Sequence, residues 1–399
     1  MEYDIVIIGG GQAGLSFAAS LMDTSLSIAV IEKRELSLLS EPKPDGREIA
    51  LTHLSVDILK KLAVWQLIPE EVICPLKEAR VFDGESSSYL DFTSQNKEKN
   101  ELGYLIPNYK ICHALYQRVS TADNVELLTQ QSVADVTRQA DYSTIHLENG
   151  DTITTKLVIA ADSRFSTIRK KMGIPALMQD FSKVMIVAQM DHQQSHQNIA
   201  LECFHYERTL ALLPMVGNSS SVVITVATDK VDAVMKQDEA AFNQDMTQAF
   251  RGELGEMTLQ GERHCYPLMG VYSQQLVSHR FALIGDAAVG MHPVTAQGAN
   301  LGLRGQDILA AEIKKSVRRG TDIGSLAVLK GYERKQINMN RMMYFGTNGV
   351  VALFTNDTPM AKKIRKTLLA VVKHFPPVKH LISHHLTNTS SGIRKFLPF

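Results

Sequence analysis

The sequence predicts an α/β protein that combines a Rossmann-like nucleotide-binding domain, a mainly antiparallel β-sheet domain and a C-terminal helical region. Three observations support this fold class: an apolar strand, a glycine-rich turn and a helix at the N-terminus, alternating apolar strands between residues 184 and 227, and helical spacing from about residue 300 onward. The predicted domains are 1–75, 101–180 and 270–345 for nucleotide binding, 76–100 and 181–269 for the substrate, and 346–399 for basic amphipathic helices.

Length and composition indicate an ordinary globular protein. The 399 residues are 44% hydrophobic, and 42 Lys and Arg balance 42 Asp and Glu, so no overall charge favours nucleic acid as a partner. The four cysteines form no CxxC pattern, which argues against a metal site and a disulfide framework and fits a reducing cytoplasm. We expect neither a secretion signal nor a membrane-spanning segment.

The N-terminal segment predicts a dinucleotide-binding βαβ unit over residues 3–31. Gly9, Gly11 and Gly14 form GxGxxG between the first strand and the helix, and Glu32 follows the second strand. The first glycine permits a tight turn, the second lets backbone N–H groups approach a pyrophosphate, and the third allows close helix–strand packing. The motif alone does not distinguish FAD from NAD, but a single unit of this kind favours a permanently bound flavin.

Later segments extend this sheet, whereas the chain between them has a different pattern. Residues 157–161 and 281–284 form further apolar strands that each end in an acidic turn, so one sheet is assembled from dispersed segments. Residues 184–227 alternate around a turn at 217–219 and predict an antiparallel sheet on the substrate side. The polar stretch 93–100 is the best candidate for a mobile loop.

Residues 283–307, LIGDAAVGMHPVTAQGANLGLRGQD, predict the second half of the nucleotide site. The segment begins as a strand, turns at Gly285 and Asp286, and enters a helix near Gly298. An acid at a strand end can bind sugar hydroxyls, and a helix N-terminus can stabilise negative charge on a reduced isoalloxazine ring. His292 precedes a proline and is explained more simply by packing than by chemistry, so the sequence nominates no catalytic residue.

At this point the chain resembles the class A flavoprotein monooxygenases, and within them the ubiquinone-biosynthesis hydroxylases of the UbiH, UbiF and UbiM group. The resemblance covers nearly the whole chain, because its motifs occur jointly and in the same order. These motifs are GGGQAG, DGREIALTHLSVDILKKLAVW, GYLIPNYKICHAL, ADSRFSTIR, LALLPM and GDAAVGMHPVTAQGANLGL. The resemblance implies a non-covalent FAD.

The resemblance also implies cofactor roles position by position. Arg47 matches an arginine near the FAD, Asn108 a polar side chain at the ribityl region, and Asp286 the acid on the ribityl chain. Asp162 matches the acid that supports the pyrophosphate and, in some members, the nicotinamide cofactor, while Pro293 and the residues 297–300 match the pyrimidine side of the ring. The full set of expected cofactor-binding residues is Gly9, Gly11, Gln12, Ala13, Gly14, Glu32, Lys33, Arg47, Asn108, Asp162, Asp286, Pro293, Gln297, Gly298, Ala299 and Asn300.

Three positions depart from the family pattern. Ser163 stands where relatives usually have glycine, and the chain has a single nucleotide-binding unit, so we expect slow reduction by free NADPH or NADH; NAD(P)H is one possible electron donor, and the direct donor stays open. Ala296 replaces the first glycine of HPxxGQG, and Val289 stands where many relatives have histidine. These last two features are most similar to the UbiM branch.

The implied activity is hydroxylation of the aromatic ring of a polyprenylated phenol in ubiquinone biosynthesis, with O2 activated as a flavin C4a-hydroperoxide. Two alternatives stay open: a flavin-dependent reductase or dehydrogenase on the same scaffold, and a non-catalytic flavin- or lipid-binding subunit of a quinone-biosynthesis complex. Four isolated side chains could lie near the phenol, although such residues usually belong to the core. They are Tyr104, His205, Tyr206 and His264.

The C-terminal tail is strongly basic, since eight Lys and Arg and no acidic residue follow Asp357. Apolar residues lie among these cations, a pattern that fits amphipathic helices on the anionic inner face of the cytoplasmic membrane. The alternative is a pair of helices that dock on protein and expose a solvated basic face. The cations are Lys362, Lys363, Arg365, Lys366, Lys373, Lys379, Arg394 and Lys395.

Overall fold

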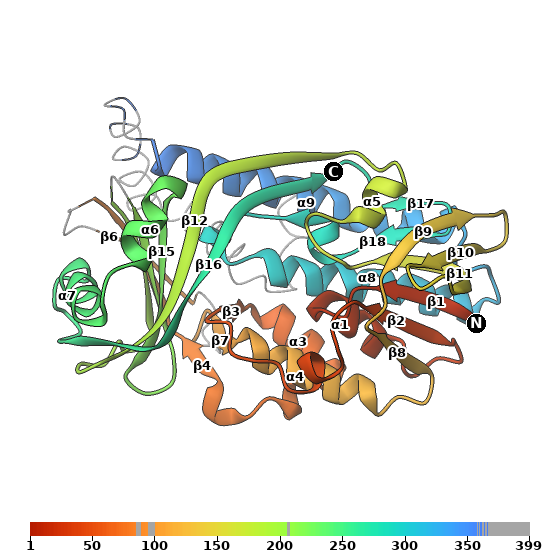
Figure 1. The fold of residues 1–399 in the computed structure, drawn as a ribbon, viewed down its shortest axis with the longest axis horizontal. Coiled ribbons are helices and arrows are strands. Elements are labelled where there is room, and N and C mark those ends of the chain that lie inside the picture. Colours follow the sequence, from red (N-terminus) through yellow and green to blue (C-terminus); the bar gives the residue numbers. More distant parts are fainter. Residues whose placement is uncertain are drawn as a thin grey trace.

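A computed structural model describes residues 1–84, 89–94, 100–205 and 208–356, together with 358, 360, 363 and 365. Within these residues the chain builds two large sheets and one small sheet, which helices cover (Figure 1). The predicted mixed α/β class with C-terminal helices is confirmed. The predicted loop at 93–100 lies mainly outside the described residues, as does most of the basic tail.

Sheet 1 is formed by dispersed segments, as the sequence predicted. Its strands are β1 (Glu2–Ile8), β2 (Ile28–Glu32), β8 (Val125–Thr129), β9 (Val133–Arg138), β10 (Ser143–Leu147), β11 (Thr152–Ala160), β17 (Val277–Ser278) and β18 (Phe281–Leu283). β1 pairs in parallel with β2 and β11, and β11 pairs in parallel with β18. Ile5, Val6 and Ile7 are fully buried in this central strand, which explains its unbroken apolar run.

Helices and a small sheet surround sheet 1. The helices are α1 (Gln12–Ser20), α2 (Ser37–Ser40), α3 (His53–Lys61), α4 (Asn108–Ser120), α5 (Thr167–Lys171), α8 (Gly298–Arg318) and α9 (Leu326–Phe354). α1 packs against both α4 and α8, and α8 packs against α9. Sheet 3 contains β3 (Glu48–Leu51), β4 (Cys74–Leu76) and β7 (Gly103–Pro107). The short turns η1 (Trp65–Leu67) and η2 (Glu70–Val72) connect α3 to β4.

Sheet 2 is predominantly antiparallel and has its own core. Its strands are β5 (Glu78–Asp83), β6 (Tyr89–Thr93), β12 (Ala176–His192), β13 (Ile199–Phe204), β14 (Thr209–Pro214), β15 (Ser219–Ala227), β16 (Met257–Ser273) and β19 (Val289–Gly290). Ile186, Val222 and Ile224 pack there with Phe242 of α7 (Glu239–Ala249), while η3 (Thr228–Lys230) and α6 (Val231–Met235) precede that helix. β12 and β16 run side by side from sheet 2 toward sheet 1 (Figure 1).

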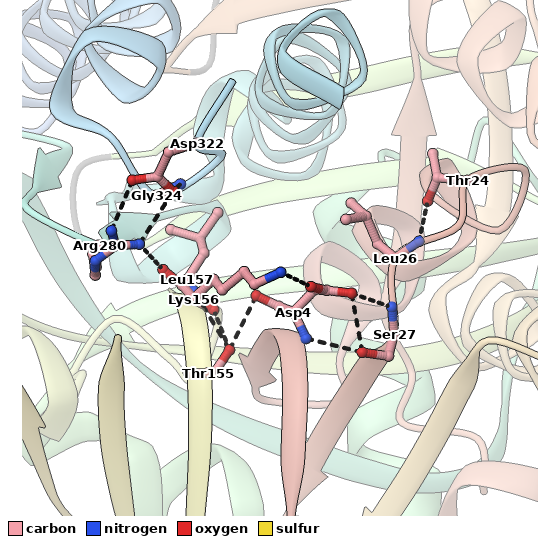
Figure 2. A network of polar contacts seen from close by, with 10 residues as sticks. All are labelled: Asp4, Thr24, Leu26, Ser27, Thr155, Lys156, Leu157, Arg280, Asp322 and Gly324. Carbon is pink, nitrogen blue, oxygen red and sulfur yellow. Dashed lines mark hydrogen bonds and ion pairs between the residues drawn. The ribbon is translucent and has the colours of Figure 1, made fainter. Parts of the chain in front are cut away.

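A polar network connects the N-terminal ends of the parallel strands of sheet 1 (Figure 2). Asp4 at the start of β1 accepts hydrogen bonds from Ser27 and forms an ion pair with Lys156 of β11 at 2.7 Å. Arg280, before β18, donates to the backbone oxygen of Lys156 and pairs with Asp322 at 2.7 Å. Since β1 begins at this end of the sheet, Gly9 and the carboxyl ends of the parallel strands lie at the opposite end.

Arg365 corrects one expectation about the basic tail. Its side chain is 1% exposed and pairs with Asp83 of β5 at 3.1 Å. It also donates hydrogen bonds to the carbonyl oxygens of Leu353, Phe354 and Asn356, at and just beyond the end of α9. A cation at this position satisfies carbonyl groups that a helix C-terminus leaves without partners. Arg365 is therefore an internal anchor, and its inclusion among the cations offered to a surface was wrong.

Candidate functional site

The first and third glycines of the N-terminal turn are required by the fold itself. Gly9 has φ +111°, and a Cβ atom there would lie 2.4 Å from the carbonyl oxygen of Ala161. A Cβ on Gly14 would lie 1.9 Å from the carbonyl oxygen of Gly9, far inside van der Waals contact. The turn therefore packs directly against the end of β11, and neither position can accept a side chain without backbone movement.

Gly11 differs from its two neighbours, because nothing in the described protein requires glycine there. Its φ of −83° and ψ of −171° are open to any residue, and a Cβ would meet no atom within 4 Å. Gly11 is the N-cap of α1, and no side chain caps that helix end. An open space in front of uncapped backbone N–H groups fits a phosphate, and Gln12 and Ala13 begin the helix beside it.

Glu32 lies where the sequence placed it, buried beside the glycine turn. Its Oε2 accepts a hydrogen bond from the backbone N–H of Gly10 at 2.8 Å, and Arg34 donates to both carboxylate oxygens at 3.0 and 3.1 Å. Burial alone raises the pKa of Glu32, but hydrogen bonds and charge from Arg34 outweigh it and lower the pKa. The carboxylate is thus a charged acceptor, while Lys33 is exposed. The motif did not identify Arg34 as its partner.

The two halves of the predicted nucleotide site meet at the start of α1. Gly285, in the turn η4 (Gly285–Ala287), has φ +58°, and a Cβ there would lie 2.6 Å from the Cβ of Ala13. Asp286 follows and forms an ion pair with Arg164 at 2.8 Å. Sequence reasoning missed Arg164, which lies in the ADSRFSTIR segment that carried the resemblance.

Asp162 adjoins the same turn and carries an unsatisfied atom. Its Oδ2 accepts a hydrogen bond from the backbone N–H of Thr167 at 3.1 Å, whereas its Oδ1 is buried and has no hydrogen-bond partner among the described residues. Its Cα lies 2.9 Å from the position of a Cβ on Gly9. A buried carboxylate oxygen without a partner fits a group that donates a hydrogen bond from a ligand. Ser163 beside it is exposed.

Asn108 and Arg47 come together through an aspartate that the sequence did not single out. Gln12 donates to Oδ1 of Asn108 at 2.7 Å, and Nδ2 of Asn108 donates to Asp45 at 2.7 Å. Arg47 donates to the same Asp45 oxygen at 2.6 Å. Because α1, α4 and the loop before β3 each contribute, these side chains form one polar wall beside the glycine turn.

Sheet 2 closes over this loop. Tyr266 of β16 donates its hydroxyl to the carbonyl oxygen of Asp45 at 2.7 Å, and Ser221 of β15 donates to that of Gly46 at 3.2 Å. The guanidinium of Arg47 lies 5.3 Å from the centre of the Tyr266 ring. His264 also borders the loop, since its Cδ2 lies 2.9 Å from a Cβ placed on Gly46. The wall therefore lies at the junction of the two large sheets.

Glu48 is the most strongly perturbed carboxyl group near this wall. Burial, and then the charge of Asp45, raise its pKa from 4.5 to about 8. Such a group keeps its proton at neutral pH. Its position directly after Arg47 in the DGREIAL motif was available from the sequence, but its burial was not.

The segment from His292 to Asn300 is shaped by internal hydrogen bonds. Nδ1 of His292 accepts from the backbone N–H of Val294 at 3.3 Å, and its buried Nε2 has no hydrogen-bond partner among the described residues. Burial, and then Lys183, lower the pKa of His292 to about 4, so the ring is neutral at physiological pH. Pro293 begins the turn η5 (Pro293–Thr295), and Ala296 follows with φ +51°, a left-handed conformation that glycine adopts more easily.

Asn300 connects this segment to sheet 3. Its Oδ1 accepts hydrogen bonds from the backbone N–H of Thr52 and the hydroxyl of Ser55, and its Nδ2 donates to the carbonyl oxygens of Ala50 and Ala296. The side chain is 2% exposed, so its polar atoms are engaged by protein. Gln297 is also buried, whereas a Cβ on Gly298 would meet no atom within 4 Å, and the backbone of Gly298 and Ala299 begins α8 in that open space.

The remaining candidates are separated from one another. Tyr104 donates to Glu101 at 2.7 Å and packs edge-on against Trp65, which places it in the core beside sheet 1. His205 follows β13 in sheet 2, and Tyr206 lies outside the described residues. Of the four, His264 is thus the one whose contact with the Asp45 loop is established.

Comparisons with known proteins agree with this geometry. The family described as FAD binding domain matches residues 2–340. The chain is 44% identical over 391 residues to a Neisseria meningitidis protein named ubiquinone hydroxylase UbiM, covering 97% of this chain and 85% of that protein. It is 32% identical over 386 residues to ubiquinone hydroxylase UbiL of Rhodospirillum rubrum, covering 97% and 90% of the two chains.

Among solved structures, p-nitrophenol 4-monooxygenase PnpA from Pseudomonas putida DLL-E4 superimposes with a TM-score of 0.78 at 16% identity, covering 97% of this chain and 98% of that one. At this identity the likeness establishes the fold alone. The match to the FAD-binding family and the sequence identity to UbiM and UbiL over nearly the whole chain establish homology as well. The chain therefore belongs to the FAD-dependent hydroxylases of the ubiquinone-biosynthesis UbiH, UbiF and UbiM group, within the class A flavoprotein monooxygenases.

Proposed function

We propose that this protein hydroxylates the aromatic ring of a polyprenylated phenol on the way to ubiquinone, with FAD as its cofactor and O2 as co-substrate. The observation that carries the proposal is the space at Gly11, which neither backbone conformation nor neighbouring atoms explain and which a pyrophosphate would fill. The substrate class follows the names of the relatives, ubiquinone hydroxylases UbiM and UbiL.

The cofactor would extend from the glycine turn to the start of α8. In this arrangement Gly9 to Gly14 face the pyrophosphate, Glu32 the adenosine ribose, and Asp286 the ribityl chain. Arg47 and Asn108 would border the flavin from the polar wall, and the free Oδ1 of Asp162 would accept a hydrogen bond from it. Pro293 and the residues 297–300 would contact the ring by backbone, because the polar atoms of Asn300 are already engaged.

FAD supplies the redox chemistry that activates O2 for transfer of one oxygen atom to the ring. The protein's task is to orient the phenol and exclude water, and the hydrogen bonds from Tyr266 and Ser221 to the 45–46 loop fix sheet 2 over the polar wall for this purpose. Glu48 holds a proton beside this wall at neutral pH, since its pKa is raised to about 8. The N-terminus of α8, a helix of 21 residues, offers positive potential to negative charge on the ring.

Oxygen consumption tests the proposal. Purified protein with bound FAD, given an electron donor and a prenylated phenol, should consume O2 and yield a product one oxygen atom heavier. Turnover without O2 would identify a reductase or dehydrogenase instead. A protein that binds FAD but never turns over would identify a non-catalytic subunit. The quinone intermediate that accumulates in cells lacking the protein would identify which ring oxygen is missing.

We also propose that the domain boundaries follow the two large sheets. Residues 1–75, 101–180 and 270–345 would form the FAD-binding domain, 76–100 and 181–269 the substrate domain, and 346–399 a C-terminal region. The separate hydrophobic cores beside sheet 1 and within sheet 2 support this division. Limited proteolysis with and without FAD should protect the first group of segments together.

The basic tail is proposed to hold the protein at the inner face of the cytoplasmic membrane. Among the helices that the structure describes, none has the length and apolar character needed to cross a bilayer. Seven tail cations remain once Arg365 is assigned to Asp83, and each can add about 1 kcal/mol near an anionic surface. Replacing Lys366, Lys373 and Lys379 with glutamine should weaken flotation on anionic vesicles and preserve the Arg365 anchor. Unchanged flotation would favour docking on other biosynthetic proteins.

A further inference from the structure

The long helix α9 buries polar side chains and exposes apolar ones along much of its length. A surface helix normally buries an apolar stripe and exposes polar residues. Near its two ends α9 buries the apolar side chains Leu329, Val351 and Phe354, whereas the buried stripe between residues 333 and 347 is polar, with exposed fractions of 8% or less. The members of this polar stripe are Glu333, Gln336, Asn340, Tyr344 and Thr347.

Hydrogen bonds hold this polar stripe against the rest of the protein. Glu333 accepts from the backbone N–H of Leu276 at 2.8 Å, and Gln336 donates to Asn340 at 2.8 Å and to the carbonyl oxygen of Leu301 at 3.3 Å. The orientation of α9 is therefore fixed by directional contacts as well as by apolar burial. The helix cannot rotate to hide its other face without breaking these bonds.

From Met342 onward the outward face of α9 is apolar, whereas the polar side chains of Arg334, Lys335, Asn338 and Arg341 are exposed before it. Met342, Phe345 and Val350 have exposed fractions of 45%, 48% and 39%. The small residues Gly346 and Gly349 lie between them and are also exposed. This surface continues onto neighbouring β12, where Leu177 is 44% exposed.

The register of sheet 2 places Leu177 beside Phe345. Leu177 is directly opposite Tyr272 in the antiparallel pair of β12 and β16, and such partners project from the same face of a sheet. The rings of Tyr272 and Phe345 lie 5.7 Å apart, and Gln179 bonds to Asn348 at 2.8 Å on the same side. We call Leu177, Met342, Phe345 and Val350 the α9 patch.

The charged side chains that α9 itself contributes near the α9 patch have one sign. Residues 334–356 contain Arg334, Lys335 and Arg341 and no acidic residue. Lys335 is paired with Glu312, whereas Arg341 is exposed and lines an open hollow of about 460 Å³ together with Asn338, Met342 and Phe345. Cation and apolar surface thus meet in one depression, and the basic tail follows in the sequence.

We propose that the α9 patch rests on an anionic lipid bilayer. Met342, Phe345, Val350 and Leu177 would enter the boundary between head groups and acyl chains, and Arg341 would contact lipid phosphates. A second copy of the chain fits less well, because symmetric pairing would bring Arg341 of both copies together, and residues 334–356 contain no acid to balance them. The purpose of this contact, access to a prenyl tail in the bilayer, rests on the proposed function, although the contact itself does not.

Flotation of the full-length protein with bound FAD tests this surface. The vesicles contain phosphatidylcholine, either alone or mixed with phosphatidylglycerol. The double variant Met342→Ser/Phe345→Ser should reduce binding to the mixed vesicles by about tenfold, because it removes apolar surface that would enter the bilayer. The matched control Tyr142→Ser/Val216→Ser alters two side chains that are 44% and 49% exposed elsewhere, and it should bind like the unaltered protein.

A second variant guards against misfolding of the first. Arg341→Glu changes an exposed charge and should lower binding to mixed vesicles by about tenfold, with little effect on pure phosphatidylcholine. Equal binding of all variants, absence of binding by the unaltered protein, or equal binding to both vesicle types would overturn the proposal. So would a dimer of the unaltered protein that the double variant converts to a monomer.

The same samples separate this inference from the proposed function. FAD content and hydroxylation of a short-tailed phenol dissolved in detergent should be unchanged in the α9 variants. A protein that floats through the α9 patch but never hydroxylates would contradict the proposed function alone. A protein that hydroxylates but fails the flotation tests would contradict the membrane surface alone.

Discussion

Substituting Gly11 and Gly14 separately should distinguish a ligand requirement from a folding requirement within one motif. A Cβ on Gly14 would lie 1.9 Å from the carbonyl oxygen of Gly9. Since carbon and oxygen normally approach no closer than about 3 Å, the helix must move by about 1 Å, which in a packed interior costs on the order of 3 kcal/mol. Gly14→Ala should therefore lose stability even when FAD is absent.

Gly11→Val should behave in the opposite way. The backbone at Gly11 accepts any side chain, and the space around it is open, so unfolding of the FAD-free protein should change by no more than about 1 kcal/mol, the usual range for an N-cap residue. The valine would occupy the space in front of the helix N-terminus. We expect FAD binding to weaken at least about 100-fold, or about 2.7 kcal/mol. Gly11→Ala has a smaller side chain, so its affinity for FAD should lie between those of the unaltered protein and Gly11→Val.

Urea unfolding of the FAD-free proteins and fluorescence titration with FAD measure the two effects independently. The largest loss of apo stability should occur at Gly14, and the loss of FAD affinity without loss of apo stability at Gly11. A stable Gly11→Val protein that binds FAD as tightly as the unaltered chain would refute the assignment of this space to the cofactor. Equal loss of apo stability in both variants would show that the motif serves only the fold.

Four further outcomes follow from individual residues. Since the pKa of Glu48 is raised to about 8 in the folded state, its stabilising effect is complete below pH 4.5 and is lost as pH rises through 8. Urea unfolding at pH 5 and pH 9 should show that Glu48→Gln reduces the loss between these two values by about 4 kcal/mol. Asn300→Ala removes four hydrogen bonds and should cost about 2–4 kcal/mol in the same assay, and unchanged stability together with intact FAD affinity would contradict its positioning role. Ala296→Gly relieves a φ of +51° and should stabilise by about 0.5–1 kcal/mol, seen as a higher melting temperature. Reduction of bound FAD by free NADPH or NADH should be slow because Ser163 replaces glycine, and rapid saturable bleaching in anaerobic stopped-flow would show that this departure is harmless.

Local sequence patterns were sufficient to predict the strand, helix and acidic residue that surround the glycine turn. The glycine spacing, the unbroken apolar run of β1 and Glu32 are close together in the chain, and each depends on backbone geometry that nearby residues specify. The later motif from Gly285 onward was found in the same way, and the structure brings it against Ala13. These features could be predicted because residue type alone determines where the chain can turn tightly or form a buried parallel strand.

Contacts between distant segments required the tertiary structure. Asp45 opens the DGREIAL motif, but the sequence assigned it no role. Folding places it among Gln12, Arg47, Asn108 and Tyr266, and no local pattern encodes these contacts.

The same holds for the perturbed pKa of Glu48 and for the outward apolar face of α9, because both depend on which neighbours exclude water. The helical spacing from about residue 300 onward predicted helices but not which side of α9 would be buried. Polar contacts to Leu276 and Leu301 decided that orientation. The amino-acid sequence by itself therefore determined the glycine turn and the family of the chain. The packing of sheet 2 and α9 on sheet 1 decided which groups face the site, the solvent and the proposed membrane. It did so because burial and local charge arise only when distant segments come together in the folded chain.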